Sequence, residues 1–235
     1  MIFRQLFEPQ SSAYTYLLAC AETREAMLID PVLETADRDL ALLKELGLEL
    51  KYTLETHIHA DHVTGADRLR DQTGSKAAVP QKSNAHHVDL PVREGQAIHV
   101  GKLRIEPLYT PGHTDDHHSY FVAGADCARV FTGDALMIDG CGRTDFQNGD
   151  AATLFRSVHE KIFTLPPDTL VYPGHDYQQR RVSSIAQERA RNPRLGGGKS
   201  LEEFVAIMAG LNLPRPRQMD VAVPANRECG EVQIA

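Results

Sequence analysis

The segment from His57 to His62 constrains this chain more than any other. It reads His-Ile-His-Ala-Asp-His, so three imidazoles and one carboxylate fall within six positions, shortly after the hydrophobic run from Tyr52 to Leu54. Imidazole nitrogens and carboxylate oxygens are the ligands that suit zinc and iron in proteins. Charged residues are rarely buried in a core without a partner. The segment therefore predicts a metal site at the end of a strand.

Three further residues of ligand type occur in similar surroundings: His113, Asp134 and His175. Each follows an apolar stretch and comes directly after a glycine. A strand that ends in a Gly-containing loop brings its last side chains to the edge of a sheet, where loops carry function. We therefore expect these residues to join the His57–His62 segment in one metal centre rather than to lie on an exposed polar surface.

The composition is that of an ordinary globular protein with one large or two small domains. Of the 235 residues, 42% are apolar and 24% are charged. A formal net charge of −7 argues against nucleic acid as a partner. We also predict no membrane partner, because no apolar run approaches the length of a membrane span and the N-terminus does not resemble a secretory signal.

The chain has four widely spaced cysteines, with no Cys-x-x-Cys pair: Cys20, Cys127, Cys141 and Cys229. This spacing is not that of a disulfide framework, and it predicts a reducing, cytoplasmic location. Cys141 lies between two glycines and follows Asp134 closely in the sequence. Of a catalytic thiol and a packing role in a tight loop, we favour packing for this residue.

Apolar alternation and turn residues predict strands, and apolar residues three or four apart predict helices. The expected strands span 13–18, 26–30, 51–55, 103–108, 119–122, 129–132 and 169–172. The expected helices span 36–46, 62–72, 151–163, 178–191 and 200–208, and the tail from Leu213 is expected to be extended. Alternating strands and helices with mixed connections indicate an α/β (α+β) fold class, with two sheets flanked by helices.

A first resemblance rests on seven ligand-type residues in a fixed order: His57, His59, Asp61, His62, His113, Asp134 and His175. This order is similar to the pattern of the metallo-β-lactamase superfamily and covers residues 10–190. The resemblance implies a four-layer αβ/βα sandwich with the metal centre at the sheet edges. Most members are hydrolases with two metal ions. In them the ligands would be His57, His59 and His113 for one ion, and Asp61, His62 and His175 for the other, with Asp134 bridging.

A narrower resemblance runs nearly from end to end. The segments that carry it are 132–136, 140–147, 157–163, 173–177, 192–194, 211–214 and 222–226. They look like the persulfide dioxygenase (sulfur dioxygenase) family. This resemblance implies an enzyme of sulfide oxidation that converts glutathione persulfide, O2 and water to sulfite and glutathione. It also implies one non-haem Fe(II) per subunit and a homodimer.

Carried onto this sequence, the family's metal ligands are His57, His113 and Asp134. Two imidazoles and one carboxylate form the facial triad of non-haem Fe(II) oxygenases, which leaves positions open for substrate and O2. The remaining ligand-type residues are then expected to form hydrogen bonds around the iron; they are His59, Asp61, His62 and His175. Residue types alone would also allow a second ion, so the sequence leaves the metal count open.

Two residues match family positions near the substrate, Arg143 and Tyr177, which implies that they contact glutathione. Arg143 has an alternative role as the ion-pair partner of an acid such as Asp145. Tyr177 has an alternative role in core packing. We expect His117 and His118 to begin the next strand rather than to bind a metal.

The alternative function is that of a glyoxalase II-type hydroxyacylglutathione thioester hydrolase with two metal ions. It predicts a long helical extension with several basic residues. Here only one short helix is expected after residue 194, which favours the dioxygenase. A third hypothesis is a non-enzymatic metal-binding partner protein with a degenerate site. The complete set of ligand-type residues argues against it. We expect a catalytic domain over residues 1–194 and a short C-terminal extension over 195–235 packed on the same domain.

Overall fold

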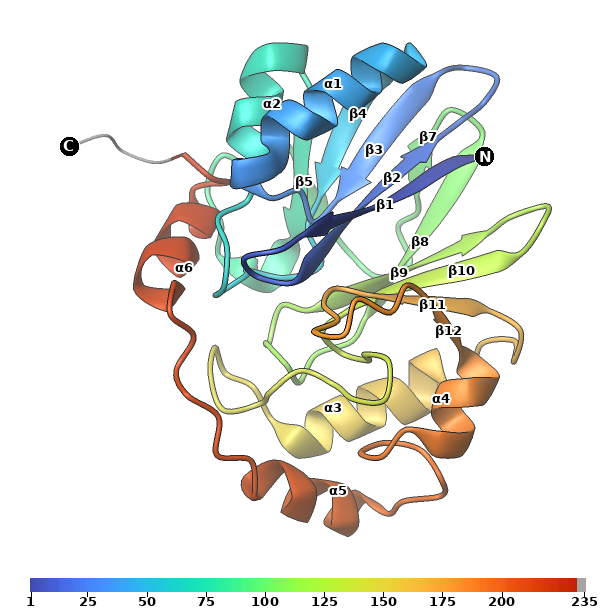
Figure 1. The fold of residues 1–235 in the computed structure, drawn as a ribbon, viewed down its shortest axis with the longest axis vertical. Coiled ribbons are helices and arrows are strands. Elements are labelled where there is room, and N and C mark those ends of the chain that lie inside the picture. The colour runs from blue at the N-terminus through green and yellow to red at the C-terminus, as the bar shows by residue number, and fades with distance from the viewer. Residues whose placement is uncertain (232–235) are drawn as a thin grey trace.

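The computed structural model describes residues 1–231, whose strands form two mixed six-stranded sheets that face each other (Figure 1). The first sheet has the order β1-β2-β3-β4-β5-β6, and its neighbours from β3 to β6 run parallel. Its strands are β1 (Ile2–Glu8), β2 (Ala13–Ala19), β3 (Glu25–Ile29), β4 (Glu49–Leu54), β5 (Lys76–Pro80) and β6 (Leu90–Val92).

The second sheet has the order β12-β11-β10-β9-β8-β7. Its strands are β7 (Ile98–Val100), β8 (Leu103–Tyr109), β9 (His118–Ala123), β10 (Ala128–Gly133), β11 (Leu170–Pro173) and β12 (Ser183–Ser184). β10 and β11 run parallel, so their carboxyl ends lie at the same edge of the sheet. This pairing positions two of the predicted site residues, as described below.

Helices cover the outer faces of both sheets (Figure 1). α1 (Ala36–Leu46) and α2 (Ala66–Thr73) lie on the first sheet, and α3 (Ala151–Ser157), α4 (Ile185–Arg191) and α5 (Leu201–Ala209) lie beyond the second. A π-helical turn, η3 (Val158–Ile162), continues α3, and α6 (Met219–Arg227) lies beside the first sheet. Two 3₁₀ turns are η1 (Leu33–Thr35) and η2 (Gln81–Ser83). The four layers confirm the predicted αβ/βα sandwich.

β2 illustrates why the sequence folds into layers. Tyr16 and Leu18 point into the core between the two sheets, whereas Leu17 and Ala19 point the other way and pack with Leu43 of α1. Successive side chains of a strand lie on opposite faces, so a strand that is covered on both sides is apolar at nearly every position. This explains the continuous apolar run over residues 13–19 and fixes the sheet between two cores.

The C-terminal segment continues the same packing. Leu195 is fully buried, and Phe204 of α5 packs with Leu154 of α3 in the core beneath the second sheet. α6 crosses to the first sheet, where Asp67 donates a backbone hydrogen bond to the carbonyl of Cys229. The proposed division into residues 1–194 and a C-terminal extension stays a prediction.

The helix predicted over residues 178–191 is wrong in its first half. The backbone N–H groups of Gln178 and Arg180 donate to the Asp176 carboxylate at 3.2 and 2.6 Å, so the chain forms a turn there. α4 therefore begins only at Ile185. Such side-chain bonds to nearby backbone compete with helix formation, and helical spacing of apolar residues does not reveal them.

Two further predictions are corrected. The helix expected over residues 62–72 begins at Ala66, because side chains from distant segments hold the preceding residues in an open loop. The tail that was expected to be extended contains α6, even though Pro224 lies inside that helix and lacks a backbone donor. The sequence also did not predict β1, β5, β6, β7 and β12. Of these, β6, β7 and β12 have three residues or fewer, and β1 is only partly buried.

Candidate metal centre

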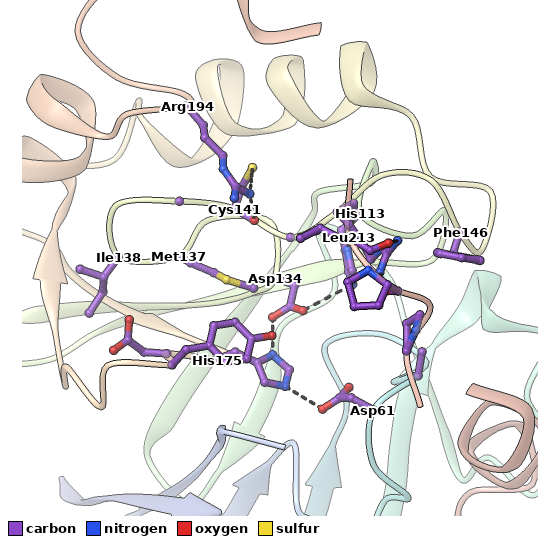
Figure 2. Close-up of a pocket in the computed structure, with 18 of the residues that line it drawn as sticks. Asp61, His113, Asp134, Met137, Ile138, Cys141, Phe146, His175, Arg194 and Leu213 are labelled. Atoms are coloured by element: carbon purple, nitrogen blue, oxygen red, sulfur yellow. Dashed lines mark hydrogen bonds and ion pairs between the residues drawn. The ribbon is translucent and has the colours of Figure 1, made fainter. Parts of the chain in front are cut away.

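Four strands bring the ligand-type side chains to one edge of the sandwich. β4 ends shortly before His57, β8 ends before His113, and β10 and β11 end next to Asp134 and His175. Because β10 and β11 are parallel neighbours, Asp134 and His175 leave the same end of the second sheet. Asp61, from the loop after β4, points toward this pair (Figure 2).

His57, His113 and Asp134 form one group of potential metal ligands. One ligand atom of each lies within 4.8 Å of the others, and His113 Nε2 lies 3.5 Å from Asp134 Oδ2. Ligand bonds of about 2.1 Å to one shared ion are compatible with such separations. The structure thus brings together the three residues that the sequence predicted as metal ligands.

The hydrogen bonds of His57 fix which of its nitrogens can bind a cation. The Thr56 hydroxyl donates its single hydrogen to Asp30 at 2.9 Å, so it must accept from His57 Nδ1, which lies 2.9 Å away. His57 Nε2 therefore carries a lone pair. Burial, followed by the neighbouring rings of His59 and His113, holds the pKa of His57 well below its usual value, so this ring is neutral. A neutral imidazole is the form that binds metals.

His113 is oriented in the same way from another part of the chain. Its Nδ1 donates to the backbone carbonyl of Arg143 at 2.6 Å, which leaves Nε2 with a lone pair on the side of Asp134. A metal-bound histidine characteristically donates its other N–H to a carbonyl or carboxylate in this manner. Both imidazoles are thus held in the tautomer that a cation requires.

Asp134 is held at its backbone and at its carboxylate. Its N–H donates to His117 Nε2 at 3.1 Å, and its Oδ1 accepts from His175 Nδ1 at 2.7 Å. Burial would raise the pKa of Asp134, but the neighbouring His175 brings it down to about 2, so the carboxylate is charged. His117 therefore supports a candidate ligand, and β9 begins at His118. The sequence did not predict this supporting role of His117.

His175 is engaged at both ring nitrogens. Nδ1 contacts Asp134 and Nε2 contacts Asp61 Oδ2 at 2.8 Å. Although burial opposes it, the two carboxylates raise the pKa of His175 well above its usual value. An imidazolium that donates from both nitrogens has no lone pair for a metal ion. Asp61 Oδ2 also accepts from His62 Nδ1 at 2.9 Å, so this carboxylate links two imidazoles.

The His59 ring lies close to two carboxyl groups, those of Asp30 and Glu55. Its Nε2 lies 3.2 Å from Asp30 Oδ1 and 3.6 Å from Glu55 Oε2. Burial opposes the charge, but Asp30 leads the groups that raise the pKa of His59 to about 9. Burial raises the pKa of Glu55 to about 8. Two more groups of ligand atoms lie within 4.8 Å of one another, His59–Asp61–His62 and Asp30–Glu55–His59. Nδ1 of His62 contacts Asp61, whereas Nε2 of His62 and Nδ1 of His59 are buried without a hydrogen-bond partner in the described residues.

The backbone of the loop after β4 is fixed by side chains that the sequence did not single out. Asp30 Oδ1 accepts from the N–H of Thr56 at 2.7 Å, and Asp116 Oδ2 accepts from the N–H of Ile58 at 3.0 Å. Gln147 donates to the Ile58 carbonyl at 2.7 Å. Asp30 directly follows the apolar strand β3, which is the one signal in the sequence that could have indicated its role.

A cavity of about 690 Å³ opens onto the metal centre (Figure 2). Tyr177 lines it with 75% of its surface exposed, which excludes the core-packing alternative for this residue. Arg143 lines it too, and also pairs with Asp145 at 2.6 Å and donates to the carbonyl of Pro214 at 2.6 Å. The predicted ion pair of Arg143 is therefore present together with its place in the cavity wall.

Cys141 lies in the cavity wall but is buried. Its Sγ lies 3.8 Å from Met208 Sδ, and burial raises the pKa of the thiol to about 11. A thiol with a raised pKa is a poor nucleophile at neutral pH. These features support the packing role. All four cysteines of the chain are free.

Gly142 lies where a side chain would disturb two of the candidate ligands. A Cβ there would come within 2.6 Å of His113 Nδ1 and 2.7 Å of the Asp134 carbonyl oxygen. We expect Gly142→Ala to weaken iron binding on the order of tenfold, as loss of supporting contacts around a metal does. Iron content after gel filtration measures this. Gly140→Ala is the matched control, because a Cβ there meets nothing within 4 Å in the described part of the chain. Equal iron content in both variants would contradict the prediction.

The comparisons with known proteins agree with this geometry. The model of the metallo-beta-lactamase superfamily matches residues 9–175. Persulfide dioxygenase ETHE1, mitochondrial, of Mus musculus is 52% identical over 230 residues, which are 98% of this chain and 89% of the mouse protein. The crystal structure of ETHE1 from Myxococcus xanthus has a TM-score of 0.94 and 53% identity, covering 98% of this chain and 100% of that one.

A hydrolase relative is more distant. The probable hydroxyacylglutathione hydrolase glo2 of Schizosaccharomyces pombe is 34% identical over 168 residues, which are 70% of this chain and 64% of the yeast protein. The stronger and longer matches confirm the narrower of the two resemblances in the sequence. This chain belongs to the persulfide dioxygenase family of the metallo-β-lactamase superfamily.

Proposed function

We propose that this protein is a non-haem Fe(II) persulfide dioxygenase, an oxidoreductase that converts glutathione persulfide, O2 and water to sulfite and glutathione. The observation that carries the proposal is the group of His57, His113 and Asp134, in which two imidazoles and one charged carboxylate converge. This donor set is that of the facial triad in non-haem iron oxygenases. Family membership and the 0.94 TM-score to a solved ETHE1 structure support the same reaction.

The same three residues would hold one Fe(II) per subunit. When bound, the iron supplies the redox chemistry that activates O2, which zinc lacks. Nε2 of His113 and Nε2 of His57 would bind the iron, because Arg143 and Thr56 accept from the Nδ1 atoms of these rings. His175 holds the Asp134 carboxylate through one oxygen, so the other oxygen would bind the iron.

The proposed count of one ion rests on the partners of the other imidazoles. His175 donates to Asp134 and Asp61, and His59 faces Asp30 and Glu55. A second ion would have to displace these partners and remove a proton from His175. We therefore propose His59, Asp61, His62 and His175 as hydrogen-bonding and charge-balancing groups around a single iron.

The cavity has the size and charge to bind a tripeptide thiol with two carboxylates. We propose that Arg143 and Tyr177 contact the glutathione part of the substrate. Arg143→Ala is expected to raise the KM for glutathione persulfide on the order of tenfold, the lower range for losing a hydrogen bond to a charged group. Iron content should be unchanged. Steady-state O2 uptake measures this.

Asp145→Ala is the matched control for Arg143. It removes the ion-pair partner but keeps the guanidinium in the cavity wall. If Arg143 acts by binding substrate, Asp145→Ala should leave KM near the value of the unaltered protein. An equal rise of KM in both variants would show that the ion pair stabilises the loop and that Arg143 does not bind the substrate.

The thioester hydrolase is the alternative that an experiment must separate. Metal analysis of the purified protein and an oxygen electrode suffice. One iron per chain with O2 uptake dependent on glutathione persulfide supports the dioxygenase. Two zinc ions per chain, with thioester cleavage of a hydroxyacylglutathione and no O2 uptake, would overturn it.

Two features of the wider assembly stay predictions. We propose a homodimer and a cytoplasmic location; the mammalian relatives carry the word mitochondrial in their names. Within residues 1–231, no helix has both the length and the apolar character that crossing a bilayer demands.

A further inference from the structure

We propose that Asn226, in α6, is a positioning residue for the metal-binding loop. Its side chain is 3% exposed and makes three hydrogen bonds to one segment. Oδ1 accepts from the N–H of Thr64 at 2.8 Å, and Nδ2 donates to the carbonyl oxygens of His59 and His62, both at 2.9 Å. Both N–H groups of the amide therefore donate hydrogen bonds to the segment that follows His57.

The three bonds determine where the side chains of this segment point. With the carbonyls of His59 and His62 held, the peptide planes that follow these two residues are fixed, and Asp61 lies between them. The His59 ring then faces Asp30 and Glu55, and the Asp61 carboxylate reaches His175. Because His175 in turn holds Asp134, Asn226 acts on the metal centre through the loop, without touching any candidate ligand.

The other end of the loop is also held by hydrogen bonds from side chains. We call the two sets of bonds, at Ile58 and at Asn226, the clamp on this loop. Ile58, directly after His57, is held through its N–H by Asp116 and through its carbonyl by Gln147. Without Asn226, two buried carbonyls and one buried N–H would lose their partner, and each unsatisfied group is costly. The segment after His59 is then expected to shift toward water and carry its imidazoles with it.

α6 is attached to the body of the protein independently of Asn226. The N–H of His86 donates to the Arg227 carbonyl at 2.6 Å, and the N–H of Asp67 donates to the Cys229 carbonyl at 3.1 Å. Glu228 also contacts His86 at 2.8 Å. A substitution at Asn226 can therefore remove the clamp while the helix stays in place.

Substitution by aspartate separates positioning from packing. Asn226→Asp has nearly the same shape and keeps an oxygen for the N–H of Thr64, but it replaces the two donors with a charged oxygen beside two carbonyls. If Asn226 only fills space, aspartate should be tolerated better than alanine. If it positions the loop, Asn226→Asp should be at least as damaging as Asn226→Ala.

The experiment rests on the proposed metal centre and measures metal retention in addition to activity. The unaltered protein, Asn226→Ala, Asn226→Asp and the control Glu228→Gln are loaded anaerobically with Fe(II), and release to a ferrous chelator is followed. We expect release on the order of tenfold faster from both Asn226 variants, since supporting residues around a metal have effects of this size. Glu228→Gln should release iron at the rate of the unaltered protein.

Thermal unfolding with and without Fe(II) distinguishes a positioning role from a general loss of stability. Bound metal stabilises the folded state by a free energy that increases with the logarithm of its affinity. A positioning residue reduces the increase in Tm that Fe(II) produces, whereas a merely structural residue lowers both Tm values equally. If Asn226→Asp does not fold, Asn226→Ser serves the same purpose, because a hydroxyl has one donor and cannot satisfy both carbonyls.

Each outcome decides a separate point. Failure of the unaltered protein to bind Fe(II) would overturn the proposed metal centre itself. Normal binding by the unaltered protein, with unchanged release from Asn226→Asp, would overturn the role of Asn226 alone. Equally fast release from Glu228→Gln would also overturn it, since the docking of α6 as a whole would then be responsible.

Discussion

Asp134→Ala is expected to abolish iron binding and persulfide-dependent O2 uptake, whereas Asp61→Ala should retain most of the iron. Asp134 is the carboxylate that groups with His57 and His113 among the described residues. Removing it leaves two imidazoles, too few donors to retain Fe(II) through gel filtration. Asp61 contacts His62 and His175 and is joined to the three candidate ligands only through His175. Iron content and oxygen uptake, measured on the same preparations, test the pair.

The comparison also tests the number of ions. In a centre with two ions, Asp61 would bind the second, and its loss would reduce metal content about as much as the loss of Asp134. Equal loss in the two variants would therefore contradict the single-iron proposal. Asp61→Ala should still lower the rate of turnover, because His175 loses one of the two carboxylates that hold it.

Asp30→Ala is expected to destabilise the metal-free protein by about 3–5 kcal/mol, the range for removing one member of a buried ionic group. Asp30 is 2% exposed, accepts from the N–H and the hydroxyl of Thr56, and faces His59 at 3.2 Å. Without Asp30, the N–H of Thr56, the hydroxyl of Thr56 and the ring of His59 stay buried and lose this partner. Urea unfolding without metal measures the effect, because bound iron would otherwise add its own stabilisation.

Asp37→Ala is the matched control for Asp30→Ala. Asp37 lies on α1 with its side chain 82% exposed and contacts Arg68 at 3.3 Å. An exposed pair of this kind contributes little, so the change in unfolding free energy should stay within about 0.5 kcal/mol. A loss at Asp30 no greater than that at Asp37 would show that the buried group of Asp30, Glu55 and His59 does not support the loop.

Much of the fold follows from local patterns. The apolar spacing over residues 36–46 predicts α1 with its observed bounds, and the apolar run over 13–18 predicts β2 to within one residue. The tail did not follow from such patterns. The prolines and arginines over residues 213–217 indicate an extended tail. α6 nevertheless forms further on, because Asn226 and the backbone of Arg227 find hydrogen-bond partners in distant loops.

The residues that support the centre were harder to predict than the candidate ligands. His57, His113 and Asp134 follow strands and stand beside glycines or other imidazoles, which is a local pattern. Asp30, Glu55 and Asn226 are single polar residues in ordinary surroundings. Their importance depends on contacts across the fold, such as the bond from Asn226 to His59, 167 residues earlier in the chain.

Local sequence patterns indicate which ligand-type residues are available and which edge of the sandwich they reach. This is possible because strand ends and glycine-containing loops are recognised from residues that are neighbours in the sequence. The tertiary structure decided which of them can face an ion. An imidazole binds a cation only through a nitrogen that has kept its lone pair. In His57 and His113, Nδ1 donates a hydrogen bond to a neighbouring or distant acceptor, which leaves Nε2 available. In His175, carboxylates accept hydrogen bonds from both nitrogens.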